Sequence, residues 1–306
     1  MLNQPTPTTH QDAIIVPRSA FDSDNNFSLI QANVNFVNAA IHEGYFRREE
    51  LPQNAMRSFH LDYYMAQVSN GGHGQFLGNN TGGAQTVKDV NQALSLIGLA
   101  ESYRIFRAFL TFLKADPKRA KAVKKGGGFG MSWPELEDLD KRYYASSDAL
   151  RVAHRDWLAS LPELKVVSDQ NYKEEMQGLL ESNPMVAERK QSRANTLREA
   201  FEKDPLNQAF SYMCGLLKPP IPYEKWVQAQ PVSDGSPGSV PALKFAIRTS
   251  AGLLAIVIDI RRAVVFEDGP NPRILAHSDI EPLCEHVLQK TGIGLLGYLA
   301  AMRGGN

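Results

Sequence analysis

The stretch QVSNGGHGQFLGNN (residues 67–80) decides how the first half of this chain folds. It follows the aromatic-rich run FHLDYYMA (residues 59–66), which is typical of an amphipathic helix. Asn70, Gly71 and Gly72 tolerate the left-handed backbone that a helix end and a sharp reversal need. We therefore predict that a helix ends at 70–72, and that a short turn over 73–77 returns Phe76 to the core.

The amide side chains around these glycines have a structural use. Gln67, Gln75, Asn79 and Asn80 offer donors and acceptors for the backbone groups that a broken helix leaves open. The stretch is thus explained without a ligand. A catalytic loop and a ligand cradle are the alternatives.

Helical periodicity extends on both sides of this stretch, from Phe27 to about Lys218. The run YRIFRAFLTFL (residues 103–113) is apolar on more than one face, which predicts the central helix of a bundle. The predicted core stripes are Ile30, Val34, Val37 and Ile41; Met56, Phe59, Tyr63 and Ala66; Val87, Val90, Leu94 and Ile97; and Tyr103, Phe106, Leu110 and Leu113.

Composition changes after residue 218, where the chain becomes rich in proline, glycine and serine, which excludes a helix. Beyond it, LKFAIRT (243–249), LLAIVIDI (253–260), RAVVFE (262–267) and PRILAH (272–277) read as strands, and DGPN (268–271) as a hairpin turn. The predicted fold class is α+β: a predominantly α-helical bundle followed by a small antiparallel β-meander packed with C-terminal helices. We expect an extended N-terminal segment (1–26), a helical domain (27–165), a helical extension (166–218), a linker (219–240) and a small α+β domain (241–306).

Charge and composition narrow the class of function. The 33 basic residues balance the 33 acidic ones, so direct nucleic-acid binding is not expected. Neither metal-ligand spacing nor a catalytic or cofactor motif occurs, so we expect no metal, no cofactor and no catalytic residues. Without a signal peptide or a membrane span, a cytoplasmic protein is expected.

The run KADPKRAKAVKK (residues 114–125) is the most basic segment of the chain. It could contact nucleic acid or an acidic partner, although a charge run is more often a solvated helix face. The candidate contact residues are Lys118, Arg119, Lys121, Lys124 and Lys125.

Two motifs carry a resemblance. One is NGG-x-x-QF with a nearby asparagine, and the other is L-x-x-L-D-x-x-Y. Together they resemble a bacterial helical domain family, largely of unknown function, that includes a DNA-mimic protein. The resemblance covers about residues 45–165 and implies an all-α fold with a protein-binding role. The matching residues are Asn70, Gly71, Gly72, Gln75, Phe76 and Asn79, followed by Leu136, Leu139, Asp140 and Tyr143.

From these observations we expect a non-enzymatic protein-binding protein, an immunity protein that neutralises a cognate bacterial toxin by direct contact. The expectation rests on analogy, because similar helical domains joined to a small α+β unit are common among immunity proteins. One alternative is a regulator that occupies a DNA-binding protein as a DNA mimic does. Another is an enzyme using the 60–80 region, with His60, Asp62 and His73. The sequence leaves open which toxin is bound and the oligomeric state.

Overall fold

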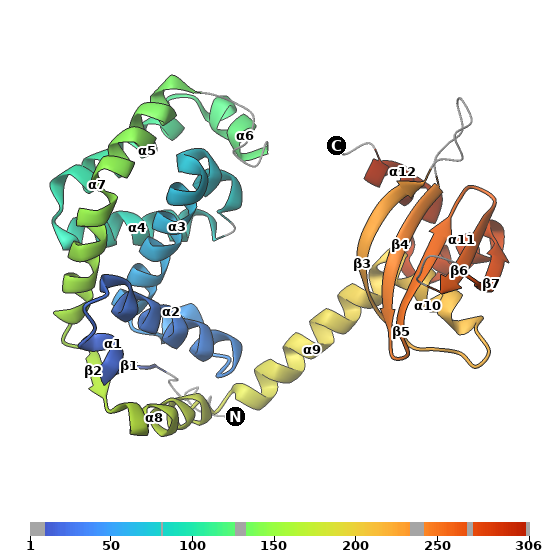
Figure 1. Ribbon diagram of the computed structural model, residues 1–306, viewed down its shortest axis with the longest axis horizontal. Helices are drawn as coiled ribbons and strands as arrows, with labels where there is room; N and C mark the ends of the chain where they lie inside the picture. Colours follow the sequence, from blue (N-terminus) through green and yellow to red (C-terminus); the bar gives the residue numbers. More distant parts are fainter. Residues whose placement is uncertain (1–9, 81, 126–132, 233–241, 268–271, 304–306) are drawn as a thin grey trace, which may run out of the picture. The chain divides into compact units, whose positions relative to one another are not determined.

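The computed structural model describes residues 10–80, 82–125, 133–232, 242–267 and 272–303 (Figure 1). Its contacts divide the chain into two compact units, Met1–Lys190 and Gln191–Asn306. Helices dominate the first unit, and an antiparallel sheet with helices forms the second. The predicted α+β class is therefore confirmed.

The first unit consists of helices with one small sheet. Strand β1 pairs in parallel with β2, with Ile14 opposite Leu164, and the β1 residues Ile14 and Val16 are fully buried. The segment predicted as extended thus contributes a core strand and a short helix. The elements are β1 (Ile14–Pro17), α1 (Arg18–Phe21), α2 (Asn26–His42), the 3-10 helix η1 (Arg48–Glu50), α3 (Gln53–Asn79), α4 (Gly83–Ile97), α5 (Ala100–Ala115), α6 (Pro117–Lys125), α7 (Pro134–Ala159), β2 (Leu164–Val167), α8 (Asp169–Glu181) and the start of α9 (Val186–Lys203).

Two hydrophobic clusters stabilise this unit, and the long helices α3 and α7 take part in both. One cluster joins β1, α2 and α8 with Met56 of α3 and Leu158 of α7. The other joins α4 and α5 with Tyr64 of α3 and Tyr143 of α7. Because these two helices belong to both clusters, the bend in α3 and its contacts with α7 set the geometry of the whole unit.

The buried faces of two helices differ from the predicted stripes. Of the stripe predicted for α3, Met56 is buried, Phe59 and Tyr63 are partly buried and Ala66 is exposed. Leu61, Tyr64, Met65 and Val68, outside that stripe, are buried. Sequences that are apolar on more than one face leave the choice of buried face to the neighbouring helices, here α4 and α7. For the same reason α5 is not a central helix: Ile105, Phe106 and Phe109 are buried, while Tyr103, Leu110 and Leu113 keep partial exposure.

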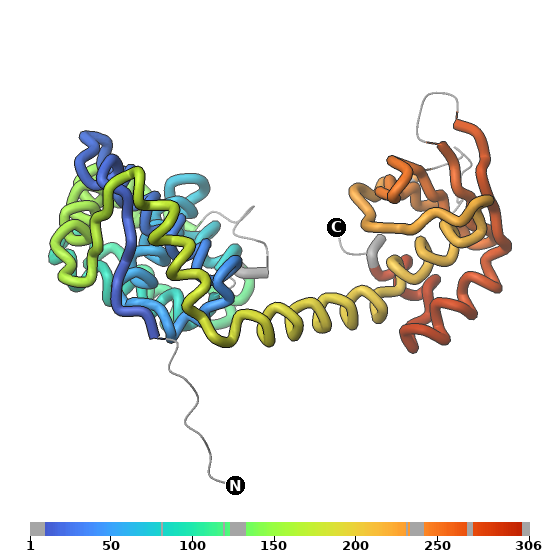
Figure 2. Tube along the Cα trace, turned by 90° about the horizontal axis from the view of Figure 1, so that it is seen from below, coloured from blue at the N-terminus to red at the C-terminus, as the bar shows by residue number. Residues whose placement is uncertain are grey.

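The second unit is a five-stranded antiparallel meander in the order β3-β4-β5-β6-β7, as predicted for the C-terminal part. Phe210 and Cys214 of α10 pack with Phe245 of β4 in its core. Figures 1 and 2 show the helices on one side of this sheet. The elements are α10 (Pro205–Gly215), β3 (Tyr223–Val232), β4 (Ala242–Thr249), β5 (Gly252–Ile258), β6 (Arg262–Glu267), β7 (Ile274–Asp279), α11 (Ile280–Thr291) and α12 (Leu295–Arg303).

The segment predicted as a linker, residues 219–240, contains strand β3. β3 is an edge strand that pairs only with β4 among the described residues, and its register shifts twice. Edge strands tolerate proline because one side needs no hydrogen-bond donors, so Pro231 does not prevent pairing. The division between the units falls within α9 instead.

Candidate functional site

Helix α3 bends at the glycine pair that the sequence singled out. Gly71 has φ −160° and ψ 29°, and Gly72 has φ 75° and ψ −177°, both outside the helical range. The predicted break is thus at its predicted place. Residues 73–79, however, resume a helix instead of forming a short turn. The buried Phe76 packs edge-on against Tyr64, so its predicted return to the core is confirmed.

Asp140 of α7 holds the bend in place. Its Oδ1 accepts hydrogen bonds from the backbone N–H of His73 at 2.8 Å and from His73 Nδ1 at 2.5 Å. The other ring nitrogen, Nε2, lies 2.9 Å from the hydroxyl of Tyr64. Burial raises the pKa of the Tyr64 hydroxyl well above its usual value, so this group stays neutral. Because a carboxylate can only accept, Nδ1 of His73 carries a proton that faces Asp140.

Tyrosines of α7 also bind backbone groups on the N-terminal side of the bend. Tyr143 donates to the carbonyl of Met65 at 3.1 Å, and Tyr144 donates to the carbonyl of Val68 at 2.9 Å. In an unbroken helix the Val68 carbonyl would accept from the N–H of Gly72, which is non-helical here. The L-x-x-L-D-x-x-Y element thus supplies the groups that the bend requires.

The amide side chains of the motif mostly bond one another. Gln67 accepts from Gln75 at 3.0 Å and from Asn79 at 2.8 Å, while Asn70 donates to Gln75 at 3.2 Å. They tie the two arms of α3 together across the bend. We predicted that these amides would hydrogen-bond the open backbone groups, but these three hydrogen bonds join side chains to one another. Side chains of α7 bond backbone groups at the bend instead.

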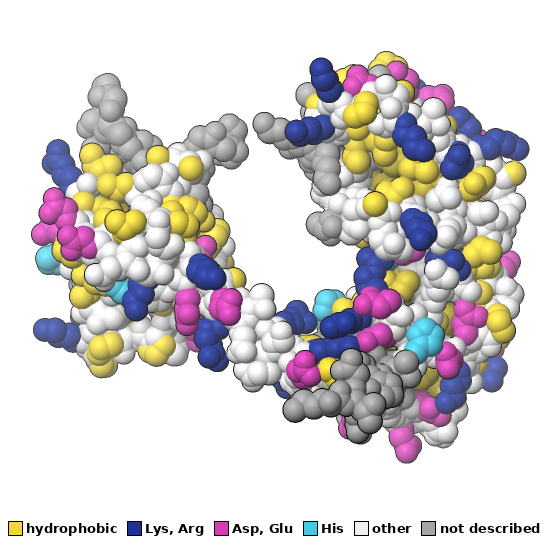
Figure 3. Space-filling view, turned by 180° about the vertical axis from the view of Figure 1, so that it is seen from behind, with side chains coloured by type: hydrophobic (Ala, Val, Ile, Leu, Met, Phe, Trp, Pro, Cys, Tyr) yellow, Lys and Arg dark blue, Asp and Glu magenta, His cyan; other side chains and the backbone are white. Residues whose placement is uncertain are grey.

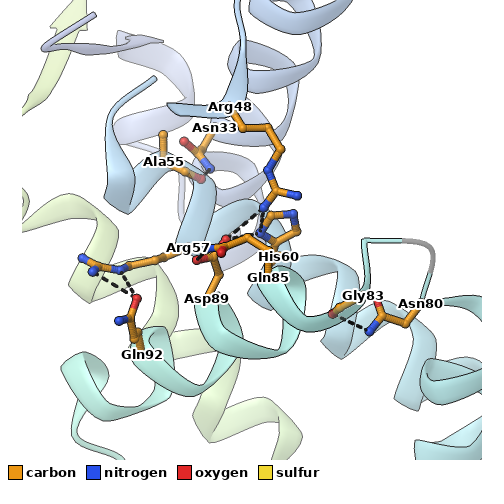
Figure 4. A network of polar contacts seen from close by, with 10 residues as sticks. All are labelled: Asn33, Arg48, Ala55, Arg57, His60, Asn80, Gly83, Gln85, Asp89 and Gln92. Carbon is orange, nitrogen blue, oxygen red and sulfur yellow. Dashed lines mark hydrogen bonds and ion pairs between the residues drawn. The ribbon is translucent and has the colours of Figure 1, made fainter. Parts of the chain in front are cut away.

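A second polar network connects η1, α3 and α4 (Figure 4). Oδ2 of Asp89 accepts from His60 Nδ1 at 2.8 Å and from an Nη of Arg48 at 3.1 Å, and its Oδ1 accepts from Gln85 at 2.8 Å. Burial by itself raises the pKa of Asp89, but the hydrogen bonds from His60 and Gln85 and the charge of Arg48 outweigh it, and the net shift is downward. The carboxylate is therefore ionised, and both of its oxygens accept hydrogen bonds.

This network forms one wall of the candidate site, a pocket of about 750 Å³. One guanidinium nitrogen of Arg48 is held by Asp89, and the side chain is 36 % exposed. Its remaining N–H groups have no hydrogen-bond partner among the described residues. The pocket combines this cation with two carboxylates and with amide and apolar side chains. It is lined by His10, Arg48, Glu49, Leu51, Gln53, Met56, Gln85 and Asp89.

The three residues of the enzyme alternative do not converge on this pocket. His60 pairs with Asp89 of α4, and His73 pairs with Asp140 of α7, at the far arm of the bent helix. Asp62 has a third environment, where burial raises its pKa to about 6 and the charge of Arg151 opposes the shift. Residues two apart on a helix point to different faces, which separates Asp62 from His60.

The basic segment lies on α6. Lys118 and Lys121 are exposed there, and the side chains of Arg119, Lys124 and Lys125 lie outside the described residues. Within the described ranges no group of three side chains could hold a metal ion, and no helix is long and apolar enough to span a bilayer.

The sequence did not single out Arg48, Gln85 or Asp89. Arg48 and Asp89 are 41 residues apart, and neither lies in a motif. The available signal was Asp89, a lone aspartate among the apolar residues of an amphipathic helix. A buried carboxylate needs hydrogen-bond donors, so its position indicates a polar network.

A family model described as DMP19-like protein matches residues 49–161, from within η1 to just beyond α7. The matched segment contains both motifs and most of the second polar network. It excludes β1, α2, α8 and the second unit. Neither a curated protein nor a solved structure matches the chain.

Proposed function

We propose that the chain is a non-enzymatic binding protein whose first unit contacts another protein, a bacterial toxin that it neutralises as an immunity protein. The observation that carries the binding role is the guanidinium of Arg48, oriented by Asp89 beside an open pocket. The toxin as partner is supported by analogy with other helical domains joined to a small α+β unit.

The chemistry of the pocket fits a peptide segment of such a partner. The free N–H groups of Arg48 can bind a carboxylate, and holding the guanidinium in place reduces the entropy lost on binding. Gln53 and Gln85 can pair with peptide N–H and C=O groups. Leu51 and Met56, which belong to the core of the unit, line the apolar side of the pocket. A central anchor with surrounding polar contacts is the usual organisation of a protein interface.

The state of the titratable groups favours binding over catalysis. Asp89 accepts three hydrogen bonds and has a lowered pKa, which makes it a weak base. His73 is fully buried between Asp140 and Tyr64, where a substrate could not reach it. These groups stabilise helix geometry, which is the role that the motif residues have in this unit.

The second candidate function is a regulator that occupies a DNA-binding protein. It is supported by the resemblance of the two motifs and by the match of residues 49–161. Such a protein presents carboxylates with phosphate-like spacing. The exposed Lys118 and Lys121 of α6 have the opposite charge, which favours the first proposal.

The proposal is tested with the products of the genes that neighbour the one encoding this chain, among which a toxin is expected. We expect the purified proteins to form a 1:1 complex and co-expression to restore growth. Gln53→Trp fills the pocket without touching the Asp89 network, and it should weaken binding by at least about tenfold, or 1.4 kcal/mol. Arg48→Gln should do the same. Arg104→Glu, on exposed α5 surface, is the charge-changing control and should bind normally.

Three outcomes contradict parts of this proposal. If no complex forms and growth is not restored, the immunity role is wrong. If the complex forms but Gln53→Trp binds as tightly as the wild type, the partner uses another surface. If the chain instead displaces DNA from a DNA-binding protein, the second candidate is correct.

A further inference from the structure

The sheet of the second unit has two different faces. On β4, Leu243, Phe245 and Ile247 point toward the helices and belong to the core of this unit. Because side chains alternate along a strand, Lys244, Ala246 and Arg248 lie on the opposite face, here named the outer face. Figure 2 shows α10 and α11 on the other side of the sheet.

One half of the outer face is apolar. Ala246 of β4 stands opposite Ala255 of β5, which stands opposite Phe266 of β6, and Val257 stands opposite Val264. Ala255 and Val264 are buried within this area, so its accessible apolar side chains are those of Ala246, Val257 and Phe266, which are partly exposed. Leu253 and Ile274 extend this area at the rim, with exposed fractions of 47 % and 59 %.

The other half is cationic. Lys225 of the edge strand β3 stands directly opposite Arg248, and Lys244 lies on the same face of β4. Like charges in directly opposed cross-strand positions destabilise a sheet. Among the described residues none of these three cations has a carboxylate partner. By contrast, Arg262 of β6 is paired with Asp259, and Arg273, just before β7, lies 2.6 Å from Glu267.

We propose that the outer face binds an acidic segment of a protein partner. Its carboxylates would pair with Lys225, Lys244 and Arg248, and its aliphatic side chains would cover the accessible apolar residues Leu253, Val257, Phe266 and Ile274. This inference concerns the second unit and goes beyond the function proposed for the first. The unpaired cations beside an apolar surface carry it, since an anionic partner removes the repulsion between Lys225 and Arg248.

Two other occupants fit less well. Single-stranded nucleic acid binds to rows of aromatic rings, but the outer face offers Phe266 among mainly aliphatic side chains. A second copy of this chain would bring the same cationic half and no matching group of carboxylates. Both are outcomes of the test.

The test uses the full chain with labelled Ile, Leu and Val methyl groups and a synthetic peptide in which Glu and Val alternate. We expect the peptide to shift the methyl signals of Leu253, Val257 and Val264 on the outer face. The inner-face signals of Ile247 and Ile256 should stay in place, which also shows that the fold is kept. The double change Lys244→Glu, Arg248→Glu should weaken binding by at least about tenfold, whereas Lys290→Glu on α11 should not.

Four outcomes would overturn the inference. The first is that the acidic peptide causes no shift, and the second is that the same peptide with Lys in place of Glu causes equal shifts. The third is that an oligothymidine binds more tightly than the peptide. The fourth is that the outer-face signals shift with protein concentration alone. The last would mean that a second copy covers this face. Arg48 and Gln53 play no part in this test, so its result is independent of the pocket in the first unit.

Discussion

His73 and Asp140, 67 residues apart, are joined by two hydrogen bonds to the same carboxylate oxygen. One comes from the backbone N–H that the bend of α3 leaves without a helical partner, and the other comes from the imidazole ring. The two sequence motifs are therefore one structural unit: the glycines create the bend, and α7 fixes it. The first three predictions concern this unit and the helix that carries it.

Gly72→Ala should destabilise the first unit. Gly72 has φ 75°, where a side chain is strained, and an added Cβ would collide with the Asp140 carboxylate. The backbone strain costs about 1–3 kcal/mol before the loss at Asp140 is added. Urea unfolding measures the change. The matched control is Gly178→Ala in α8, where a Cβ meets open space and should stabilise by about 0.5–1 kcal/mol. Equal effects of the two changes would contradict the assignment.

Asp140→Asn should also reduce stability, because it removes the charge that orients the His73 ring. A hydrogen bond to a charged group contributes about 1.5–3 kcal/mol, and the variant should lose an amount of this order. Asp138→Asn is the control, since the Asp138 side chain is 68 % exposed and its one ion pair among the described residues, with Arg142, is long at 3.8 Å. Its change should stay within about 0.5 kcal/mol. A stable Asp140→Asn variant whose His73 signals are unchanged would show that the charge is not needed.

Asp62→Asn should stabilise the protein at neutral pH and have little effect near pH 4. Burial raises the pKa of Asp62 from 3.8 to about 6, so the folded state binds the proton more tightly than the unfolded state between these values. Stability from this group is present below pH 4 and is lost as the pH rises through 6. The gain of the variant at pH 7.5 should be on the order of 1–3 kcal/mol. Unfolding of both proteins across pH 4–8 measures it, and a difference that does not vary with pH would refute it.

His154 should make the protein acid-sensitive. Complete burial lowers its pKa from 6.5 to about 3, and its Nε2 lies 2.8 Å from the hydroxyl of Ser58. Because the unfolded chain binds this proton and the folded one does not, stability falls as the pH drops below 6.5, by up to about 1.4 kcal/mol per pH unit. The ring signals of His154 should therefore remain constant between pH 7 and 5. A titration near 6.5 would show that the ring is accessible to water.

Arg189→Lys should loosen the start of α9. The two Nη atoms of Arg189 bind the two carboxylate oxygens of Glu50 at 2.6 and 2.7 Å, and one also donates to the carbonyl of Tyr45 at 2.9 Å. Lysine cannot reproduce this bidentate geometry. We expect faster amide hydrogen exchange at residues 186–190 and unchanged exchange in α5. Lys190→Arg, at the next position, is the control. Equal exchange in both variants would mean that the ion pair does not hold this helix end.

Local patterns were enough to predict several features of this protein. The helical first unit, the bend at 70–72, the burial of Phe76 and the meander after residue 242 all follow from short-range spacing, because helix and strand periods, glycine and turn residues act over a few neighbours. The expected resemblance to a helical domain family over about residues 45–165 likewise agrees with the family match over residues 49–161.

Only the tertiary structure decided which faces and partners are used. The apolar residues of α3 offered more than one stripe, and packing against α4 and α7 selected Leu61, Tyr64 and Val68. The proline-rich segment became edge strand β3 because an edge needs hydrogen bonds on one side only. The contacts of Asp140 with His73 and of Asp89 with Arg48 span 67 and 41 residues. A buried carboxylate requires donors, but no spacing rule says from which helix they come.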